Sequence, residues 1–286
     1  MRKKVILIVV LLWSILCLCS CEKVSDSTFS IQFIDVGQGD SALIGCDGRY
    51  MLIDGGDTTA SDKVYRVLEE QGIQELDILA ISHLHADHIG GLPKVLTYTS
   101  KIDKTISNRK SADTEVFRKL EHELYIDDSQ ISVPNIGDKF ELGSAQVEVI
   151  DNAAEDENDS LVLLITYGKT RFLFTGDIED TAQKRIADKY TNQKDEAYKI
   201  DVMKIPQHGA SSSNSQNGTG ALYRFIRTFM PDYGVISVGT GNPYGHPQKE
   251  TLDLLKDAGV KIYRTDVSGD ITIKSDGKHQ SIETSK

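Results

Sequence analysis

Five of the seven histidines in this 286-residue chain lie in three short segments. The densest segment is the run His83-x-His85-x-Asp87-His88. Imidazole and carboxylate groups are the ligands that borderline cations such as Zn²⁺ and Mn²⁺ accept. A loop can turn the first two histidines toward one ion, and Asp87 with His88 toward a second. The run therefore predicts a site for two divalent metal ions, and the alternative is a chance cluster on a solvated loop.

A pair of divalent ions has a well-defined chemistry in enzymes. At a separation of about 3.5 to 4 Å, the ions lower the pKa of a shared water molecule, supply hydroxide at neutral pH, and hold the attacking and leaving oxygens in line. A side-chain nucleophile is then not needed, and Asp87 is a candidate both as a ligand and as the proton acceptor. The run is thus typical of a metal-dependent hydrolase.

The run follows a buried apolar strand that we expect at residues 77–81, and open α/β sheets place their catalytic groups at such strand ends. From Phe29 onward, β-rich and helical stretches alternate along the chain, which indicates the α/β class. Further strands are expected at residues 30–36, 42–46, 49–53, 146–150, 160–167, 170–174, 201–205 and 233–238, and helices at 58–71, 112–124, 180–189, 221–229 and 248–258.

The run and its place after a strand resemble the signature of the metallo-β-lactamase superfamily. Six more segments occur in the order seen in the hydrolase domain of ComEC-type competence proteins: residues 33–40, 52–56, 160–163, 174–177, 204–209 and 242–247. The similarity spans about residues 29–275. It implies a four-layer αβ/βα sandwich, in which two mixed β-sheets are flanked by helices.

The resemblance also implies two further ligands outside the run. Asp177 stands where the family has the carboxylate that bridges both ions, and His208 would complete the second metal position. The alternatives are a helix N-cap for Asp177 and an ordinary surface histidine for His208. Many family members have two histidines before the glycine at 209, whereas this chain has Gln207 followed by His208.

A second departure concerns the segment before Ser160, where β-lactamase relatives supply another histidine. This chain has Asn158 and Asp159 there, and Asp159 is either an oxygen ligand or a turn acid. Asp40 and Asp54 lie in glycine-rich turns. They are candidates to orient a ligating histidine, and the alternative is simple turn chemistry.

Two features of the C-terminal half complete the predicted site. His246 lies between a glycine and a proline, where it would bind phosphate or protonate a leaving oxygen, and the alternative is a structural role in the turn. The polar, glycine-rich segment 211–220 follows His208 and is either a lid over the site or a plain solvated loop.

The N-terminus predicts export and lipid anchoring. Three basic residues precede an apolar run, residues 5–18, that is too short to span a bilayer and typical of a signal peptide. The following Leu-Cys-Ser-Cys resembles a bacterial lipobox, so we expect residues 1–20 to be removed and Cys21 to be lipidated. Residues 22–28 would form a tether and residues 29–286 the hydrolase domain, held at the outer face of the cell membrane. The alternative is an uncleaved anchor helix.

The net charge of −11 argues against a broad basic surface that would bind nucleic acid irrespective of its sequence. Loss of the signal leaves 29 basic and 43 acidic residues, a net charge of −14. Phosphodiester chemistry stays compatible with this charge because bound cations would meet the phosphate directly.

The resemblance implies a phosphodiesterase or nuclease that acts on extracellular DNA and is related to DNA uptake. One alternative is a hydrolase of lactones, thioesters or β-lactams, since a fold does not determine a substrate. The other is a surface lipoprotein that binds DNA or metal without catalysis and serves a separate DNA-uptake channel.

Overall fold

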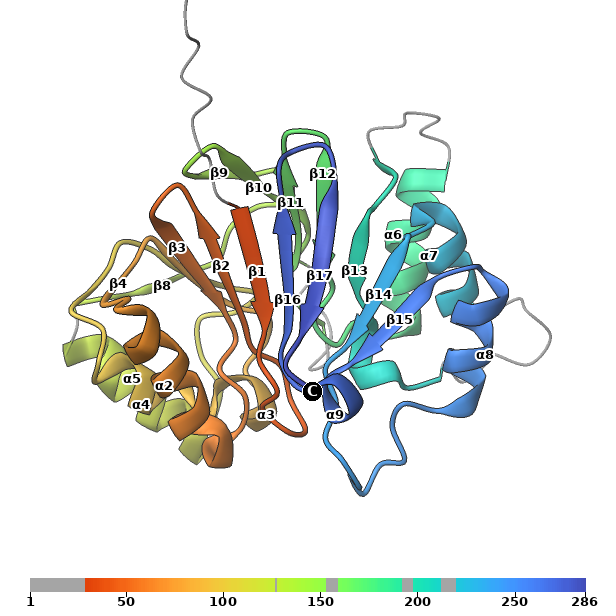
Figure 1. Ribbon diagram of the computed structural model, residues 1–286. Helices are drawn as coiled ribbons and strands as arrows, with labels where there is room; N and C mark the ends of the chain where they lie inside the picture. The colour runs from red at the N-terminus through yellow and green to blue at the C-terminus, as the bar shows by residue number, and fades with distance from the viewer. Residues whose placement is uncertain (1–28, 127, 153–158, 192–197, 212–219) are drawn as a thin grey trace, which may run out of the picture.

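A computed structural model describes residues 29–126, 128–152, 159–191, 198–211 and 220–286. Two β-sheets face each other at the centre and a layer of helices covers the outer face of each sheet (Figure 1). The predicted α/β sandwich of two mixed sheets is therefore confirmed. The predicted signal peptide, Cys21 and the tether lie outside the described residues. Within the described part of the chain, none of the helices has both the length and the apolar character needed to cross a bilayer.

The first sheet is antiparallel on one side and parallel on the other. In spatial order it contains β17 (Gln280–Thr284), β16 (Ile271–Ser275), β1 (Phe29–Phe33), β2 (Ala42–Cys46), β3 (Arg49–Ile53), β5 (Ile78–Ile81), β7 (Thr105–Ser107) and β8 (Ile131–Ser132). Pairing is parallel from β3 through β8 and antiparallel elsewhere.

The second sheet has the same mixed character. Its order is β15 (Lys261–Arg264), β14 (Tyr233–Ile236), β13 (Val202–Lys204), β12 (Thr170–Phe174), β11 (Val162–Tyr167), β10 (Ala145–Asp151) and β9 (Lys139–Leu142). Strands β12 to β15 pair in parallel, and β9 to β12 in antiparallel fashion. A separate short pair joins β4 (Glu75–Leu76) to β6 (Lys101–Ile102).

The helices divide between the two outer faces. The first sheet is covered by α2 (Ser61–Gln71), α4 (Leu92–Leu96) and α5 (Glu115–Ile126), and the second by α6 (Asp180–Thr191), α7 (Ala221–Phe229) and α8 (Lys249–Asp257) (Figure 1). Shorter helical turns are η1 (Thr58–Ala60), α3 (Ala86–Ile89), η3 (Pro206–Gly209) and α9 (Thr265–Ser268).

Three apolar layers hold the sandwich together, and β11 shows how the sequence builds them. Successive side chains of a strand point to opposite faces of the sheet. Leu163 and Ile165 therefore enter the core between the sheets, while Val162 and Leu164 enter the core beneath the helices. A strand buried on both faces reads as a continuous apolar run, which is how β11 appears in the sequence.

The topology brings many loops to one edge of the molecule. Because β1, β3, β5 and β7 run in the same direction, the segments that follow them leave the first sheet at a common edge. The parallel strands β12, β13 and β14 deliver their loops from the second sheet. In Figure 1 this is the lower edge, where α3 and α9 lie.

Several bounds differ from the sequence prediction. Strand β1 ends at Phe33 instead of residue 36, because the backbone turns locally: the Val36 N–H donates to the Ile34 carbonyl. The helix expected at 58–71 begins as the 3₁₀ turn η1, which is capped by the Asp57 carboxylate. The C-terminal hairpin of β16 and β17, not predicted from the sequence, extends the first sheet beside β1.

Candidate metal centre

Four potential ligand atoms meet at the lower edge of the sandwich. They belong to Asp87, His88, Asp177 and His208, and all lie within 4.8 Å of one another. The first two residues lie in α3, just beyond β5. Asp177 follows β12 and His208 lies in η3 after β13. The two sheets thus contribute equally to one centre, although the contributing segments are up to 121 residues apart.

The distances show how closely acids and imidazoles meet. The Nε2 atom of His208 lies 3.2 Å from Oδ2 of Asp177 and 3.3 Å from Oδ2 of Asp87. The Nε2 atom of His88 lies 3.4 Å from the same Asp177 oxygen. One oxygen of Asp177 therefore faces both histidines. Helix α6 begins only at Asp180, so Asp177 lies before the helix and its carboxylate is directed at the centre.

The histidines present Nε2 to the centre because their Nδ1 atoms are held from behind. Nδ1 of His88 lies 2.9 Å from an Asp54 carboxylate oxygen, and Nδ1 of His208 lies 2.9 Å from the Ser237 carbonyl oxygen. Each of these oxygens accepts the Nδ1 proton, so Nε2 is the atom that faces a ligand. The buried Nε2 atoms of His83 and His88 have no hydrogen-bond partner among the residues that the structure describes. This donor set fits a divalent cation.

Three hydrogen bonds hold the carboxylate of Asp54, which is more than a turn residue requires. Its Oδ1 accepts from the Ser82 backbone N–H at 2.7 Å, and its Oδ2 accepts from the Ser82 hydroxyl at 2.7 Å. The same Oδ2 contacts His88. Burial raises the pKa of Asp54, and the neighbouring His88 offsets this shift only in part. The structure therefore places Asp54 directly behind a candidate ligand.

Asp40 and Lys204 form a second layer behind the centre, and no role for the lysine was predicted from the sequence. The buried ammonium of Lys204 pairs with Oδ2 of Asp40, lies 3.3 Å from Oδ1 of Asp177, and donates to the Gly176 carbonyl at 3.0 Å. Burial opposes the charge of Lys204, but the two acids outweigh it and raise its pKa. Lys204 thus holds the outer oxygen of Asp177, so that Oδ2 alone faces the histidines. The only sequence signal is a lysine at the end of an otherwise apolar strand.

A glycine positions the Asp40 turn. Gly39 has φ of 137°, and a Cβ atom there would overlap the backbone oxygen of Asp87. The Asp40 N–H donates to this oxygen at 3.2 Å. The turn after β1 therefore packs against the loop that carries the ligands, and Asp40 Oδ1 comes within 3.4 Å of Nδ1 of His208.

His83 and His85 form a pair beside the four-atom group. Their ring centroids are 4.5 Å apart, and the His83 ring lies 4.1 Å from that of His88. His83 is fully buried, and its Nδ1 lies within 3.3 Å of the Ser82 and Ser160 hydroxyls. Burial and the neighbouring His88 hold the pKa of His83 well below its usual value. His85 is exposed.

His246 reaches the rim of the centre from the loop between β14 and α8. Its ring lies 6.4 Å from that of His208, centroid to centroid. Burial and the proximity of His208 lower the pKa of His246, so its neutral form dominates at neutral pH. The buried Nδ1 has no hydrogen-bond partner in the described part of the chain. A neutral imidazole there can donate to a phosphate oxygen, whereas protonation of a leaving oxygen would need the charged form.

Asp159 lies outside both groups of clustered ligands found among the described residues. Its side chain is buried and lies 3.8 Å from the guanidinium of Arg185, which also pairs with Asp151 at 2.6 Å. Of the two sequence interpretations, this geometry favours a structural acid. The neighbouring Asn158 and residues 212–219 of the predicted lid lie outside the described residues.

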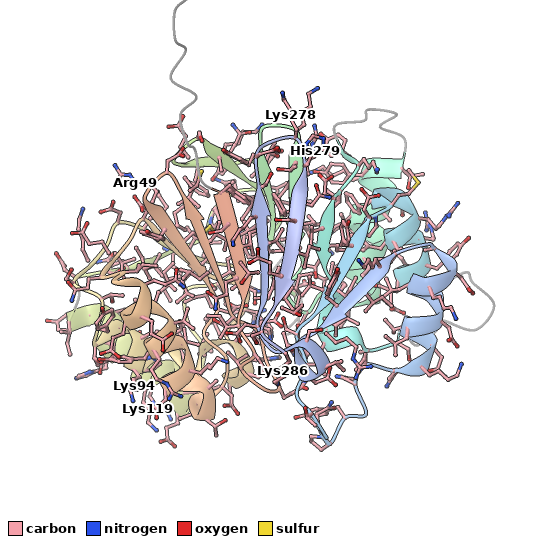
Figure 2. The ribbon with its side chains drawn as sticks, viewed as in Figure 1. Arg49, Lys94, Lys119, Lys278, His279 and Lys286 are labelled. Atoms are coloured by element: carbon pink, nitrogen blue, oxygen red, sulfur yellow. The ribbon has the colours of Figure 1, made fainter. Side chains whose placement is uncertain are left out.

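The last two histidines lie away from the centre. His279 is 83% exposed in the turn between β16 and β17, where it contacts Asp276. Figure 2 shows it with Lys278 at the end of the molecule opposite the centre. His122 lies on the exposed face of α5 and contacts Glu123.

The family follows from comparison with known sequences. The sequence profile described as "Metallo-beta-lactamase superfamily" matches residues 34–217, which contain the four-atom group. The chain belongs to the metallo-β-lactamase superfamily. All six candidate metal ligands lie within the residues that this superfamily match covers, whereas His246 at the rim lies beyond them.

Comparison with curated proteins finds relatives among the competence proteins. The chain is 27% identical over 263 residues to ComE operon protein 3 of Bacillus subtilis, covering 84% of this chain and 32% of that protein. It is 27% identical over 249 residues to competence protein ComA of Neisseria gonorrhoeae, covering 87% and 32%. The predicted resemblance to competence proteins is confirmed. The chain spans about a third of the length of these relatives.

Solved structures share the fold at low identity. The metallo-β-lactamase fold protein YhfI of Bacillus subtilis superposes with a TM-score of 0.57 at 14% identity, over 87% of this chain and all of that chain. The diiron β-hydroxylase CmlA of Streptomyces venezuelae gives a TM-score of 0.56 at 14% identity, over 88% of this chain and 55% of that chain. These likenesses show the metallo-β-lactamase fold.

Proposed function

We propose that this chain hydrolyses phosphodiester bonds in nucleic acid with the help of two divalent ions, zinc or manganese. The observation that carries the proposal is the group of Asp87, His88, Asp177 and His208, whose two histidines turn Nε2 inward. His83 and the exposed His85 beside it would hold a second ion.

Two findings support nucleic acid as the substrate. The relatives are named as competence and recombination proteins, which points to DNA. The chain is acidic overall, so its contact with a phosphate must be local, and a metal centre provides local positive charge.

Bound divalent ions would supply Lewis acidity and an activated water at this centre. The residues of the chain have separate tasks around them. Asp54 and Ser237 orient His88 and His208, and Lys204 holds the outer oxygen of Asp177. Burial would raise the pKa of Asp87, but His208 and His88 lower it well below its usual value. The ionised, half-exposed Asp87 therefore accepts hydrogen bonds from water at the mouth of the site.

His246 contributes on the rim. Its lowered pKa keeps the imidazole neutral at neutral pH, so we assign to it a hydrogen bond to a phosphate oxygen. The carbonyl and amide groups of the Asn242 side chain hold the His246 backbone in place beside the centre.

A direct test uses the full chain purified in detergent and loaded with Mn²⁺ or Zn²⁺. We expect cleavage of single-stranded DNA and of bis(p-nitrophenyl) phosphate, and a loss of more than about 100-fold in the double variant His85→Ala, Asp87→Ala. His122→Ala removes an exposed histidine of α5 and serves as the matched control. Hydrolysis of a lactone, thioester or β-lactam without any phosphodiester cleavage would contradict the assignment.

We further propose that the chain is exported and anchored through a lipid on Cys21. Strand β1 begins with Phe29 at the end of the sheet opposite the metal centre (Figure 1). The seven residues 22–28 span at most about 25 Å when extended. An anchor on that side leaves the metal centre facing away from the membrane, where a polymer in the surroundings can reach it. Labelling of cells with radioactive palmitate should mark the wild-type chain and not Cys21→Ala.

A further inference from the structure

An aromatic side chain continues outward from the metal centre. The rings of His208 and His246 are inclined by 28°, and the ring of Tyr244 follows with its centroid 5.7 Å from that of His246 and an inclination of 25°. The exposure rises along this series: His208 is buried, His246 is partly buried and Tyr244 is 65% exposed. One face of a large aromatic ring is thus presented beside the mouth of the site.

The loop that carries Tyr244 is braced from within. The Asn242 side chain donates to the carbonyls of Gly239 at 2.9 Å and His246 at 2.6 Å. Its oxygen accepts from the backbone N–H of Tyr244 at 3.2 Å and from that of His246 at 3.0 Å. Four hydrogen bonds from one side chain therefore close the loop, and the backbone of Tyr244 is fixed without any ligand.

The loop is also tied to the segment that carries a candidate metal ligand. The Gln248 N–H donates to the Gly209 carbonyl at 2.9 Å, and Gly209 directly follows His208. A Cβ atom on Gly209 would lie 2.6 Å from Cβ of Pro247, so the two segments are in close contact. Tyr244 consequently has a defined position relative to the centre. In Figure 1 the loop between β14 and α8 projects beyond the ends of the strands.

An exposed ring in this position suits one class of ligand. Every nucleobase has an apolar face that stacks on an aromatic side chain, and stacking needs no positive charge. This matters for an acidic chain with a net charge of −11, which has no broad basic surface to hold a polyanion. Bases inside a duplex already stack on their neighbours, so the ring would receive a base only from an unpaired strand.

We propose that Tyr244 is a stacking platform for an unpaired nucleobase next to the phosphate that the centre acts on. The proposal rests on the proposed phosphodiesterase function and names its preferred substrate as single-stranded nucleic acid. His246, between the platform and the metal ligands, would contact the phosphate that joins the stacked nucleotide to the next one.

The test compares Tyr244→Ala, Tyr244→Phe and wild type in the metal-loaded full chain, with metal content measured for each. The substrates are a single-stranded oligonucleotide and the same strand made abasic. Loss of one stacked base weakens binding by about 5- to 150-fold. We expect Tyr244→Ala to raise KM for the normal strand by that factor. The ratio of KM for the abasic strand to KM for the normal strand should fall by the same factor. Tyr244→Phe should leave both quantities unchanged.

Tyr125→Ala is the matched control, because Tyr125 is 85% exposed on α5 and lies away from the centre. The inference is overturned if Tyr244→Ala keeps the wild-type preference for the normal strand, or if Tyr244→Phe loses as much as Tyr244→Ala. Oligonucleotide binding measured by fluorescence anisotropy separates the two proposals. Tyr244-dependent binding without cleavage refutes the phosphodiesterase and supports the platform, whereas absence of both binding and cleavage refutes both.

Discussion

The two halves of the metal centre are built differently. The group of Asp87, His88, Asp177 and His208 draws on both sheets, and three of its members are held from behind by Asp54, Ser237 or Lys204. The pair of His83 and His85 comes from one loop. His83 is buried and held by serine hydroxyls, but His85 is exposed and flanked by solvent.

This difference indicates which half of the centre binds a metal ion more tightly. Ligands that are already oriented lose little freedom when an ion binds, and outer hydrogen bonds raise the basicity of a ligating histidine. We therefore expect the four-ligand group to bind the first ion tightly and the pair to bind a second ion more weakly. The five predictions below test this ranking, from the largest expected effect to the smallest.

Removal of one histidine from each half should have unequal consequences. His208→Ala deletes a ligand of the four-atom group and should lower the affinity of the tight ion by more than about 100-fold, since even outer partners contribute about 10- to 100-fold. His85→Ala should spare the tight ion and reduce the stoichiometry from two ions to one. Isothermal titration with Mn²⁺ or Zn²⁺, combined with elemental analysis, measures both quantities. Equal losses in the two variants would contradict the ranking.

Asp54→Asn should weaken the tight ion without removing a ligand. The neutral amide keeps the shape of the carboxylate but loses the charge that accepts the Nδ1 proton of His88 at 2.9 Å. We expect a loss of about 10- to 100-fold in affinity for the first ion. The matched control is Asp57→Asn, whose carboxylate caps the turn η1 instead of contacting a histidine. If the affinity of Asp54→Asn for metal is unchanged, Asp54 does not orient His88 and only satisfies polar groups of its own turn.

Metal binding to the four-ligand group should release protons. Burial opposes charge on His88 and His208, but the surrounding carboxylates, Asp177 foremost, together outweigh it and raise the pKa of both. An incoming ion must displace these protons, so the affinity should rise with pH by about tenfold per pH unit for each proton released. Titrations across the neutral range, in buffers of different ionisation enthalpy, count the protons.

The metal-free protein should show the opposite trend in stability. A histidine whose folded pKa is raised stabilises the fold below its unfolded pKa of about 6.5, and this contribution is lost as the pH rises through the folded pKa. Thermal unfolding with a chelator should therefore show a decline over that interval, which added metal removes. A metal-free protein that gains stability over the same interval would contradict the assigned charge states.

Asp159→Asn should have the smallest effect on metal. The Asp159 side chain lies near Arg185 instead of the centre, so the number of bound ions and their affinities should match those of wild type. Elemental analysis of the purified variant tests this directly. Loss of the weaker ion would show that Asp159 replaces the histidine that this chain lacks before Ser160.

The fold was predictable because its elements have strong local patterns. Strands β2, β3 and β12 and helix α7 have the bounds that the sequence predicted. In α7 the apolar residues Leu222, Phe225, Ile226 and Phe229 recur at helical spacing. The short strands β7 and β8 and the hairpin of β16 and β17 were missed, because strands of two or three residues and strands with polar alternate positions carry little periodic signal.

The residues of the candidate site likewise divide into those that the sequence predicted and those that only the structure revealed. The run from His83 to His88 predicts metal chemistry because four potential ligands occur within six residues. Lys204 gave no such signal, because a lysine at a strand end is ordinarily a surface residue, and only its burial against Asp40 and Asp177 reveals its partners. The place of Tyr244 beside His246 is likewise visible only in space.

The sequence by itself determined which residue types are available, in which order they occur and which strands deliver them. Tertiary structure alone decided that Asp177 and His208, 31 residues apart in the chain and about 90 or more from the histidine run, meet Asp87 and His88 within 4.8 Å. The physical reason is that parallel strands from two packed sheets end at one edge. Whether distant side chains converge depends on the pairing order of those strands, which is set by long-range packing and not by local residue patterns.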